Sequence, residues 1–118
     1  MRYKCAIVDD EPLALDILES YIRRTTYLQL ITRTNKLQTI EKLVADKEVD
    51  VVLMDVNMRG VRRESIENLL QKDCLFILVT AYPISEIQNI GWKTGQGYLA
   101  KPASYRKFVS EMERLINN

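Results

Sequence analysis

The sequence contains no histidine among its 118 residues. This excludes imidazole as a metal ligand, a general base or a phosphate carrier, so any chemistry must rest on carboxylates, hydroxyls, lysines and backbone groups. Cysteine is also scarce, because Cys5 and Cys74 are the only two and each lies in an apolar run. Two thiols provide neither a zinc site nor a disulfide framework, and we expect both to be buried.

The charge balance and the lack of a long apolar segment exclude further classes. The 17 Lys and Arg residues offset 16 Asp and Glu residues to a net charge of +1, and the charges are mixed along the chain. The net charge therefore gives no support for nucleic-acid binding driven by charge. No stretch approaches transmembrane length, and residues 1–4 lead into an apolar run without a signal-peptide core. We expect a cytoplasmic protein that does not enter a membrane.

Short apolar runs alternate with segments of helical spacing. The runs cover residues 5–8, 28–31, 51–54, 75–79 and 98–100. The first, third and fourth are apolar throughout, which is typical of central parallel strands covered on both faces, whereas the second is mixed and the fifth is short. Apolar residues at three- and four-residue steps predict helices within 13–22, 37–44, 66–70, 84–90 and 105–116.

This alternation predicts an α/β fold in a single domain, residues 1–118. The hydrophobic content of 47% is enough to bury a core over that length. Right-handed crossovers place helices on both faces of an open parallel sheet, so repeated βα units give a doubly wound sandwich. For the five predicted strands, the usual solution is the flavodoxin-like order 2-1-3-4-5.

Four of the predicted strands end in polar side chains with related chemistry. They are Asp9, Asp10 and Glu11 after the first strand, Asp55 after the third, Thr80 after the fourth and Lys101 after the fifth. Sites in such sheets form beyond the carboxyl ends of the strands, next to the point where the strand order reverses. With neighbouring strands about 4.8 Å apart, we expect these groups to share one pocket.

Each residue also has a simpler explanation. Asp9 or Asp10 could cap the first helix. Thr80 could cap a later helix, Asp55 could be an ordinary loop residue, and Lys101 could be a solvated surface lysine. Capping alone does not account for four strand ends that suit the same chemistry, so we favour a functional site.

Clustered carboxylates repel one another, so such a site needs a cation. Oxygen ligands without histidine or thiolate point to a hard ion such as Mg²⁺, which would also accept the oxygens of an incoming phosphoryl group. Asp55 is the best candidate nucleophile, because it leaves the central third strand between the acids of the first strand and Lys101. Thr80 and Lys101 would stabilise the phosphoryl oxygens.

Four segments in this order resemble the receiver domain of two-component response regulators, the CheY-like superfamily. They are residues 7–12, 53–58, 79–82 and 98–102. The resemblance covers essentially the whole chain. It implies that Asp55 accepts a phosphoryl group from a sensor histidine kinase and that Lys101 pairs with this group. It also implies that Thr80 and Tyr98 form the switch.

The same resemblance implies the metal ligands and the partners. Asp9, Asp10, Asp55 and the backbone carbonyl of Asn57 would hold Mg²⁺. The protein would be a signalling receiver rather than an enzyme, and a homodimer formed on phosphorylation is one implied assembly. It would reach DNA only through an output domain absent from this chain.

Residues 80–82 and 101–108 are most similar to receivers that precede a LytTR-type DNA-binding domain. We therefore expect a transcriptional output. The chain would be either a single-domain regulator that acts by docking or one part of a longer protein.

The segment after Asp55 departs from the family pattern. Members commonly have Asp-x-x-Met-Pro-Gly-x-x-Gly, whereas here Arg59 replaces the proline and Arg63 the later glycine, with Gly60 retained. The stiff turn is lost, and together with Arg62 three positive charges lie beside the site. These arginines are either a solvated start of the third helix or a means of attracting the phosphodonor or the kinase.

Functions from other classes are the alternatives. An interaction-only pseudo-receiver would lack Asp55, Lys101 or an acid of the first strand, and all are present. A phosphatase with an aspartyl intermediate usually carries a second acid two residues after its nucleophile, where this chain has Asn57. A nucleotide-binding module would need a phosphate loop, which the sequence lacks.

Overall fold

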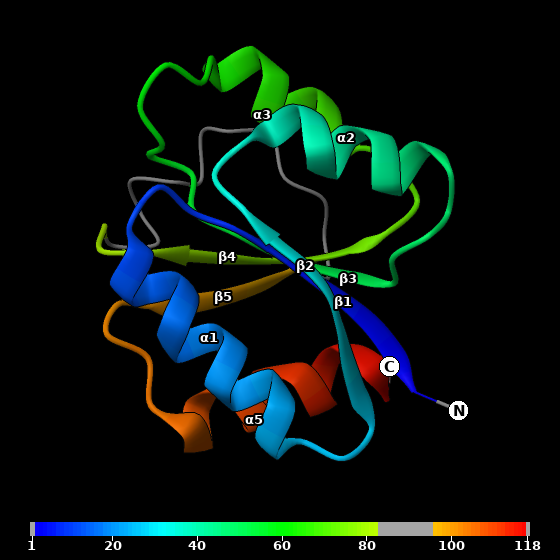
Figure 1. Cartoon of the computed structure of the whole chain (residues 1–118), viewed down its shortest axis with the longest axis vertical. Helices are drawn as coiled ribbons and strands as arrows, with labels where there is room; N and C mark the ends of the chain where they lie inside the picture. Colours follow the sequence, from blue (N-terminus) through cyan, green and yellow to red (C-terminus); the bar gives the residue numbers. More distant parts are fainter. Residues whose placement is uncertain (1, 83–95, 118) are drawn as a thin grey trace.

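Five parallel strands form one sheet in the order β2-β1-β3-β4-β5, as the sequence predicts. The computed structural model describes residues 2–82 and 96–117 (Figure 1). The strands are β1 (Tyr3–Val8), β2 (Leu28–Thr34), β3 (Val51–Met54), β4 (Leu75–Thr80) and β5 (Gly97–Ala100). The helices within these residues are α1 (Pro12–Arg24), α2 (Leu37–Ala45), α3 (Arg63–Leu70) and α5 (Tyr105–Ile116). The predicted helical segment 84–90 lies outside the described residues.

The sheet lies between two helical layers, which makes the fold the predicted flavodoxin-like sandwich. α2 and α3 cover one face, and α1 and α5 cover the other (Figure 1). Successive side chains of β1 alternate between the faces: Ala6 and Val8 join the core under α2 and α3, and Cys5 and Ile7 the core under α1 and α5. Both faces are buried, so the central strands are apolar throughout. Among the described helices, none is long and apolar enough to cross a bilayer.

β2 is longer than its sequence pattern indicates. The apolar run ends at residue 31, but pairing with β1 continues to Thr34. β2 is an edge strand, and its polar residues can therefore point away from the core. Arg33 contacts Asp16 and Glu19 of α1 at 2.7 and 2.9 Å. The apolar run in the sequence therefore predicts the start of β2 but not its carboxyl end.

Contacts between α1 and α5 hold the connection that follows β5. The Tyr21 hydroxyl donates to the Ala103 carbonyl at 2.8 Å. The Tyr21 ring packs against Tyr105 and Phe108, with ring centres 5.4 and 5.5 Å away. The Arg24 guanidinium lies 3.9 Å from the centre of the Tyr105 ring. These contacts fix the start of α5 and the short segment before it, which carries Lys101.

The two cysteines differ in exposure. Cys5 is buried in the core, and burial raises the pKa of its thiol to about 12. The prediction that both thiols are buried is wrong for Cys74, which is only partly buried just before β4. Its position at the amino end of the strand leaves it near the surface, with its Sγ 3.4 Å from the Asp50 carbonyl.

Gly97 begins β5 where the strand packs closely on its neighbours. A Cβ at this position would lie 3.0 Å from both Ile77 Cγ1 and Leu115 Cδ1. We predict that Gly97→Ala lowers the free energy of unfolding by about 1–3 kcal/mol, because these buried side chains must shift. Urea denaturation measures this change. Ser110→Ala on the exposed side of α5 is the control and should stay within about 0.5 kcal/mol of wild type. An unchanged Gly97→Ala protein would contradict the close packing.

Candidate functional site

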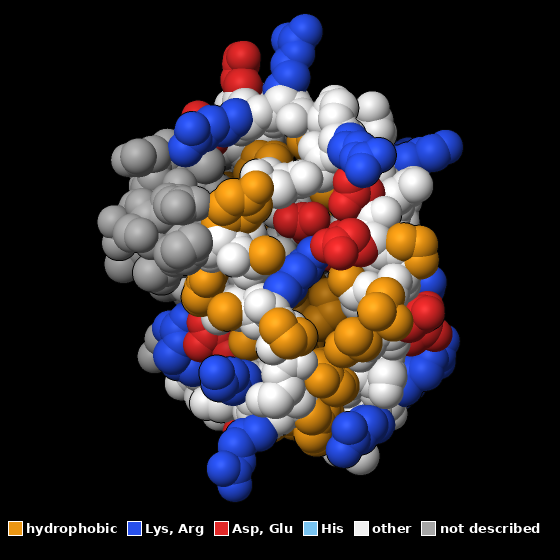
Figure 2. Space-filling model, turned by 90° about the vertical axis from the view of Figure 1, so that its left-hand side faces the viewer, with side chains coloured by type: hydrophobic (Ala, Val, Ile, Leu, Met, Phe, Trp, Pro, Cys, Tyr) orange, Lys and Arg blue, Asp and Glu red, His pale blue; other side chains and the backbone are white. Residues whose placement is uncertain are grey.

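The sheet register brings the predicted polar residues to one edge of the molecule. β1 and β3 are in register up to their last residues, so Asp9 and Asp55, the next residue of each, leave the sheet side by side. β4 and β5 are likewise in register, and Lys101 therefore follows β5 beside Thr80. Figure 2 looks onto this edge and shows acidic side chains gathered around a basic one, with hydrophobic side chains next to them.

A cavity of about 650 Å³ opens at this edge. Its walls include Asp55, Thr80 and Lys101, together with Asp10 and Glu11 from the loop after β1. These residues come from four different strand ends, as the sequence predicts. The cavity is therefore a polar pocket in which a carboxylate, a hydroxyl and an ammonium face the same space.

Lys101 is the cation that contacts the acids of this pocket. Its Nζ lies 2.6 Å from Glu11 Oε1, 2.8 Å from Asp9 Oδ2 and 3.5 Å from Asp55 Oδ2. Burial alone would lower the pKa of the ammonium, but the contacts with Asp9 and Glu11 outweigh this and hold the pKa above its usual range. Its side chain is only 16% exposed, so the interpretation of Lys101 as a solvated surface lysine is wrong.

Asp55 is a buried carboxylate, with 5% of its surface exposed. Its pKa is raised, chiefly by burial and further by the negative charge of Asp9. The Asn57 N–H, which donates to Asp55 Oδ1 at 3.0 Å, and the Lys101 ammonium oppose this shift. Burial outweighs both stabilising contacts, so the ionised form of Asp55 is held at a cost in free energy.

Asp9 does not cap α1. The N-cap position belongs to Glu11, whose side chain makes no capping hydrogen bond. Asp9 is fully buried, and its Oδ1 accepts the Glu11 N–H at 3.0 Å while its other oxygen faces Lys101. The capping interpretation of Asp9 and Asp10 is therefore wrong, and the Asp9 carboxylate orients the loop that follows β1.

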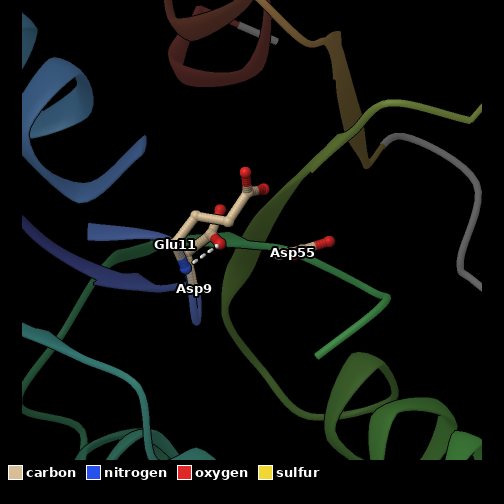
Figure 3. Close-up of side chains that lie close together, drawn as sticks. All are labelled: Asp9, Glu11 and Asp55. Carbon is tan, nitrogen blue, oxygen red and sulfur yellow. Dashed lines mark hydrogen bonds between the residues drawn. The ribbon is translucent and has the colours of Figure 1, made fainter. Parts of the chain in front are cut away.

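The structure groups Glu11, rather than Asp10, with the two buried acids. Carboxylate oxygens of Asp9, Glu11 and Asp55 all lie within 4.8 Å of one another (Figure 3). Asp10 Oδ2 instead accepts the backbone N–H of Arg59 at 3.1 Å. The sequence predicts that Glu11 shares the pocket, but the resemblance names Asp10 rather than Glu11 as a metal ligand, and no sequence pattern pairs Glu11 with Lys101.

These carboxylates fit a small divalent cation. The donor set contains only oxygen, which suits a hard ion such as Mg²⁺. Two of the three acids are buried, so their charges are poorly screened and a cation would relieve their repulsion. Asp10 lines the same cavity, and Asn57 follows Asp55 by two residues. The set of Asp9, Asp10, Asp55 and the Asn57 carbonyl stays a prediction for the metal ligands.

Hydrogen bonds connect Asp55 to the predicted switch residues. Asn57, which binds Asp55 through its backbone, also places its side-chain amide 3.4 Å from the Thr80 hydroxyl. Thr80 is fully buried, and its hydroxyl accepts the Tyr82 N–H at 3.1 Å. The Tyr98 hydroxyl donates to the Tyr82 carbonyl at 2.8 Å. The helix that Thr80 could alternatively cap lies outside the described residues.

The loop after β3, which lacks the family's proline, turns at Gly60, and the Val61 N–H donates to the Met58 carbonyl at 3.4 Å. Gly60 has a φ of +74°, a conformation that side-chain-bearing residues rarely adopt, which explains why this glycine is retained. The three arginines differ in position. Arg59 lines the cavity, Arg62 occupies the N-cap of α3, and Arg63 lies 3.6 Å from Glu67 within that helix. Only Arg59 is thus placed among the walls of the pocket.

A family model described as the response regulator receiver domain matches residues 5–113. The chain belongs to this receiver family. Receivers of this family are signalling modules of two-component systems, which agrees with the resemblance found in the sequence. No curated protein sequence matches the chain at a significant level.

Solved receiver domains share the fold. The signal receiver domain of a modulated diguanylate cyclase from Desulfovibrio desulfuricans is 20% identical, with a TM-score of 0.82, covering 99% of this chain and 95% of that one. The receiver domain of RcsB from Salmonella enterica, solved with BeF3⁻, is 12% identical, with a TM-score of 0.81 and coverages of 100% and 91%. CheY6 from R. sphaeroides, solved with the P1 domain of CheA3, is 19% identical, with a TM-score of 0.77 and coverages of 98% and 98%. At these identities the likeness establishes the fold.

Neutralising Asp55 should stabilise this receiver. Its raised pKa means that the folded state binds the proton more tightly than the unfolded state, so stability falls as the pH rises through the folded pKa. We predict that Asp55→Asn raises the free energy of unfolding at pH 7 by on the order of 1 kcal/mol. The gain should shrink as the pH is lowered toward about 4, where the unfolded carboxyl also becomes protonated.

Urea denaturation without added divalent cation, at several pH values, measures this gain. Asp73→Asn is the matched control, because it removes the same charge at an exposed position and should show little change. A less stable Asp55→Asn protein at pH 7 would show that the contacts with Asn57 and Lys101 outweigh the cost of burial.

Proposed function

We propose that this receiver accepts a phosphoryl group on Asp55 from a histidine kinase, in a reaction supported by Mg²⁺. The observation that carries the proposal is the buried Asp55 carboxylate, which shares an open cavity with the Lys101 ammonium and lies beside Asp9. A lone carboxylate in a loop would have no reason to be buried among these charges. Such an arrangement suits the stabilisation of negative charge transferred from a donor.

In this reaction, a carboxylate oxygen of Asp55 attacks the phosphorus of a phosphohistidine. The new bond is P–O, the bond that breaks is P–N, and the imidazole nitrogen leaves with the electron pair. The phosphohistidine must lie outside these 118 residues, because they contain no histidine. Mg²⁺ supplies charge neutralisation for the phosphoryl oxygens when it is bound. Lys101 adds its positive charge at the same oxygens, and Thr80 adds a hydrogen bond from its hydroxyl.

The alternatives are less well supported by the geometry. A pseudo-receiver would not need Asp9 and Asp55 both to lie beside the Lys101 ammonium, as they do. A phosphatase would need a general acid near Asp55, and the candidate position holds Asn57, whose side chain instead contacts Thr80. The protein would therefore be a signalling receiver that at most assists its own phosphorylation and dephosphorylation.

The partners belong to the same proposal. The likeness to CheY6, solved with the P1 domain of CheA3, supports a partner of the histidine kinase class. A cytoplasmic location fits such a partner. For the output, residues 101–108 support an attached LytTR-type DNA-binding domain, and this support comes from the sequence alone. A homodimer formed on phosphorylation is the further assembly that we propose.

We predict a single phosphorylation, at Asp55. Incubation with a small-molecule phosphodonor and Mg²⁺ should add one phosphoryl group to the protein, which intact-mass spectrometry detects. Asp55→Asn should abolish the added mass because it removes the nucleophile, and chelation of the metal should suppress it. Asp73→Asn, an exposed acid near β4, should be modified like wild type. Full modification of Asp55→Asn would refute the assignment.

Thr80 and Tyr98 would carry the signal away from Asp55. In the unmodified protein, the Thr80 hydroxyl accepts the Tyr82 N–H. A phosphoryl group on Asp55 adds acceptor oxygens that draw this hydroxyl toward Asp55. This removes one support of Tyr82, whose carbonyl holds the Tyr98 hydroxyl. The partly buried Tyr98 ring can then change position and alter the surface around β5 and α5. The helix 4 part of this surface lies outside the described residues.

We predict that Thr80→Ala uncouples this change from phosphorylation. In wild type, amide chemical shifts should move on phosphorylation around Asp55 and also from residue 98 to residue 109. Thr80→Ala should still be phosphorylated but should show smaller changes in that distant range, because the hydroxyl that links the two regions is gone. Ser110→Ala on α5 is the control and should retain the wild-type pattern. Undiminished distant shifts in Thr80→Ala would mean that the signal leaves by another surface.

A further inference from the structure

The shortest contact of the Lys101 ammonium is with a residue that the proposed function leaves without a role. Nζ lies 2.6 Å from Glu11 Oε1, compared with 2.8 Å from Asp9 and 3.5 Å from Asp55. The ammonium therefore binds the acids after β1 more closely than the acid after β3. Before Lys101 can pair with a phosphoryl group on Asp55, its ammonium is already bound to Asp9 and Glu11.

Glu11 is held where its carboxylate can reach Lys101. Its backbone N–H donates to Asp9 Oδ1 at 3.0 Å, which fixes the residue at the N-cap of α1 (Figure 3). The Lys101 backbone is fixed as well, since its N–H donates to the Thr80 carbonyl at 2.9 Å. Both ends of the ion pair are thus anchored to strand ends, and the pair spans the cavity beside Asp55.

The two acids that hold Lys101 differ in how easily they can release it. The Asp9 side chain is 1% exposed, so a loss of its cation would leave a buried, unpaired charge. The Glu11 side chain is 63% exposed, and water can solvate its carboxylate once the ammonium moves away. A new anion in the pocket would therefore displace Glu11 from Lys101 rather than Asp9.

We propose that Glu11 is a positioning residue that competes with the phosphoryl group on Asp55 for the Lys101 ammonium. This inference rests on the proposed function and adds a regulation of the same site. In the unmodified protein, Glu11 holds the ammonium 3.5 Å from Asp55. The phosphoryl group must break the Glu11 contact to gain Lys101, so Glu11 weakens binding of the phosphoryl state and sets how readily the receiver is switched on.

The affinity for BeF3⁻, the phosphomimetic ion used with a similar receiver, tests this competition without a phosphodonor. We expect Glu11→Gln and Glu11→Asp each to bind BeF3⁻ about two- to fivefold more tightly at saturating Mg²⁺, the range expected for a partly exposed ion pair. Aspartate keeps the charge but is one methylene shorter, so it should lose the 2.6 Å contact. Fluorine NMR measures the bound and free ion directly, even where binding is weak.

A double-mutant cycle shows whether the effect passes through Lys101. Lys101→Met should weaken BeF3⁻ binding, and adding Glu11→Gln to that variant should then change the affinity by less than about 1.5-fold, because the contact no longer exists. If Glu11→Gln raises the BeF3⁻ affinity of Lys101→Met as much as it raises that of wild type, the proposal is overturned. Glu11 would then act through its charge and not through its contact with Lys101. Glu64→Gln, which removes an exposed charge at the start of α3, should bind like wild type.

The remaining outcomes separate this inference from the proposed function. Wild-type protein that neither binds BeF3⁻ nor gains a phosphoryl group would refute the receiver function itself. Wild type that binds BeF3⁻, with Glu11→Gln and Glu11→Asp both binding equally or more weakly, would refute only the competition by Glu11. If Glu11→Gln alone binds more tightly, the charge of Glu11 matters and its contact with Lys101 does not, which also overturns the proposal.

Discussion

The burial of two neighbouring carboxylates, Asp9 and Asp55, is the constraint on which the site depends. Both follow central strands that must be apolar because helices cover both faces of the sheet. Two buried anions at this spacing are unfavourable unless a cation lies between or beside them. Lys101 provides the positive charge, and a divalent ion would add to it. The repulsion between the two carboxylates lowers the stability of the free protein. For the same reason it favours the binding of a cation, either alone or together with a phosphoryl group.

The position of Lys101 depends on parts of the fold that are far from the acids in sequence. β5 pairs with β4 up to Ala100, and the Lys101 N–H continues the ladder by donating to the Thr80 carbonyl. Beyond it, the contact between Tyr21 and Ala103 fixes the start of α5 against α1. The lysine is therefore held from both sides, and its long side chain can exchange partners within the pocket while its backbone stays in place.

One hydrogen-bonded chain connects this pocket to the surface near β5. It runs from Asp55 through Asn57 and Thr80 to Tyr82 and Tyr98. All of these residues except Tyr98 line the cavity, and Tyr98 binds Tyr82, which does line it. A change of charge at Asp55 therefore acts on a defined set of neighbours, while Glu11 acts on the other side of the pocket through Lys101. Local electrostatics at one strand end can in this way bias the shape of a more distant surface.

The sequence by itself determined the strand order, the central strands and the polar residues at their ends. Buried parallel strands are apolar, so the polar residues at or just after their ends, Asp9, Asp55, Thr80 and Lys101, stand out against those runs. Strand β2 did not follow this pattern, because it lies at the edge of the sheet and most of its residues are only partly buried. Tertiary structure alone decided which acid meets Lys101. Asp10 and Glu11 are adjacent in sequence, and only the start of α1 turns Glu11 toward the lysine and Asp10 toward the Arg59 backbone, because side-chain direction at a helix start depends on packing that no local pattern encodes.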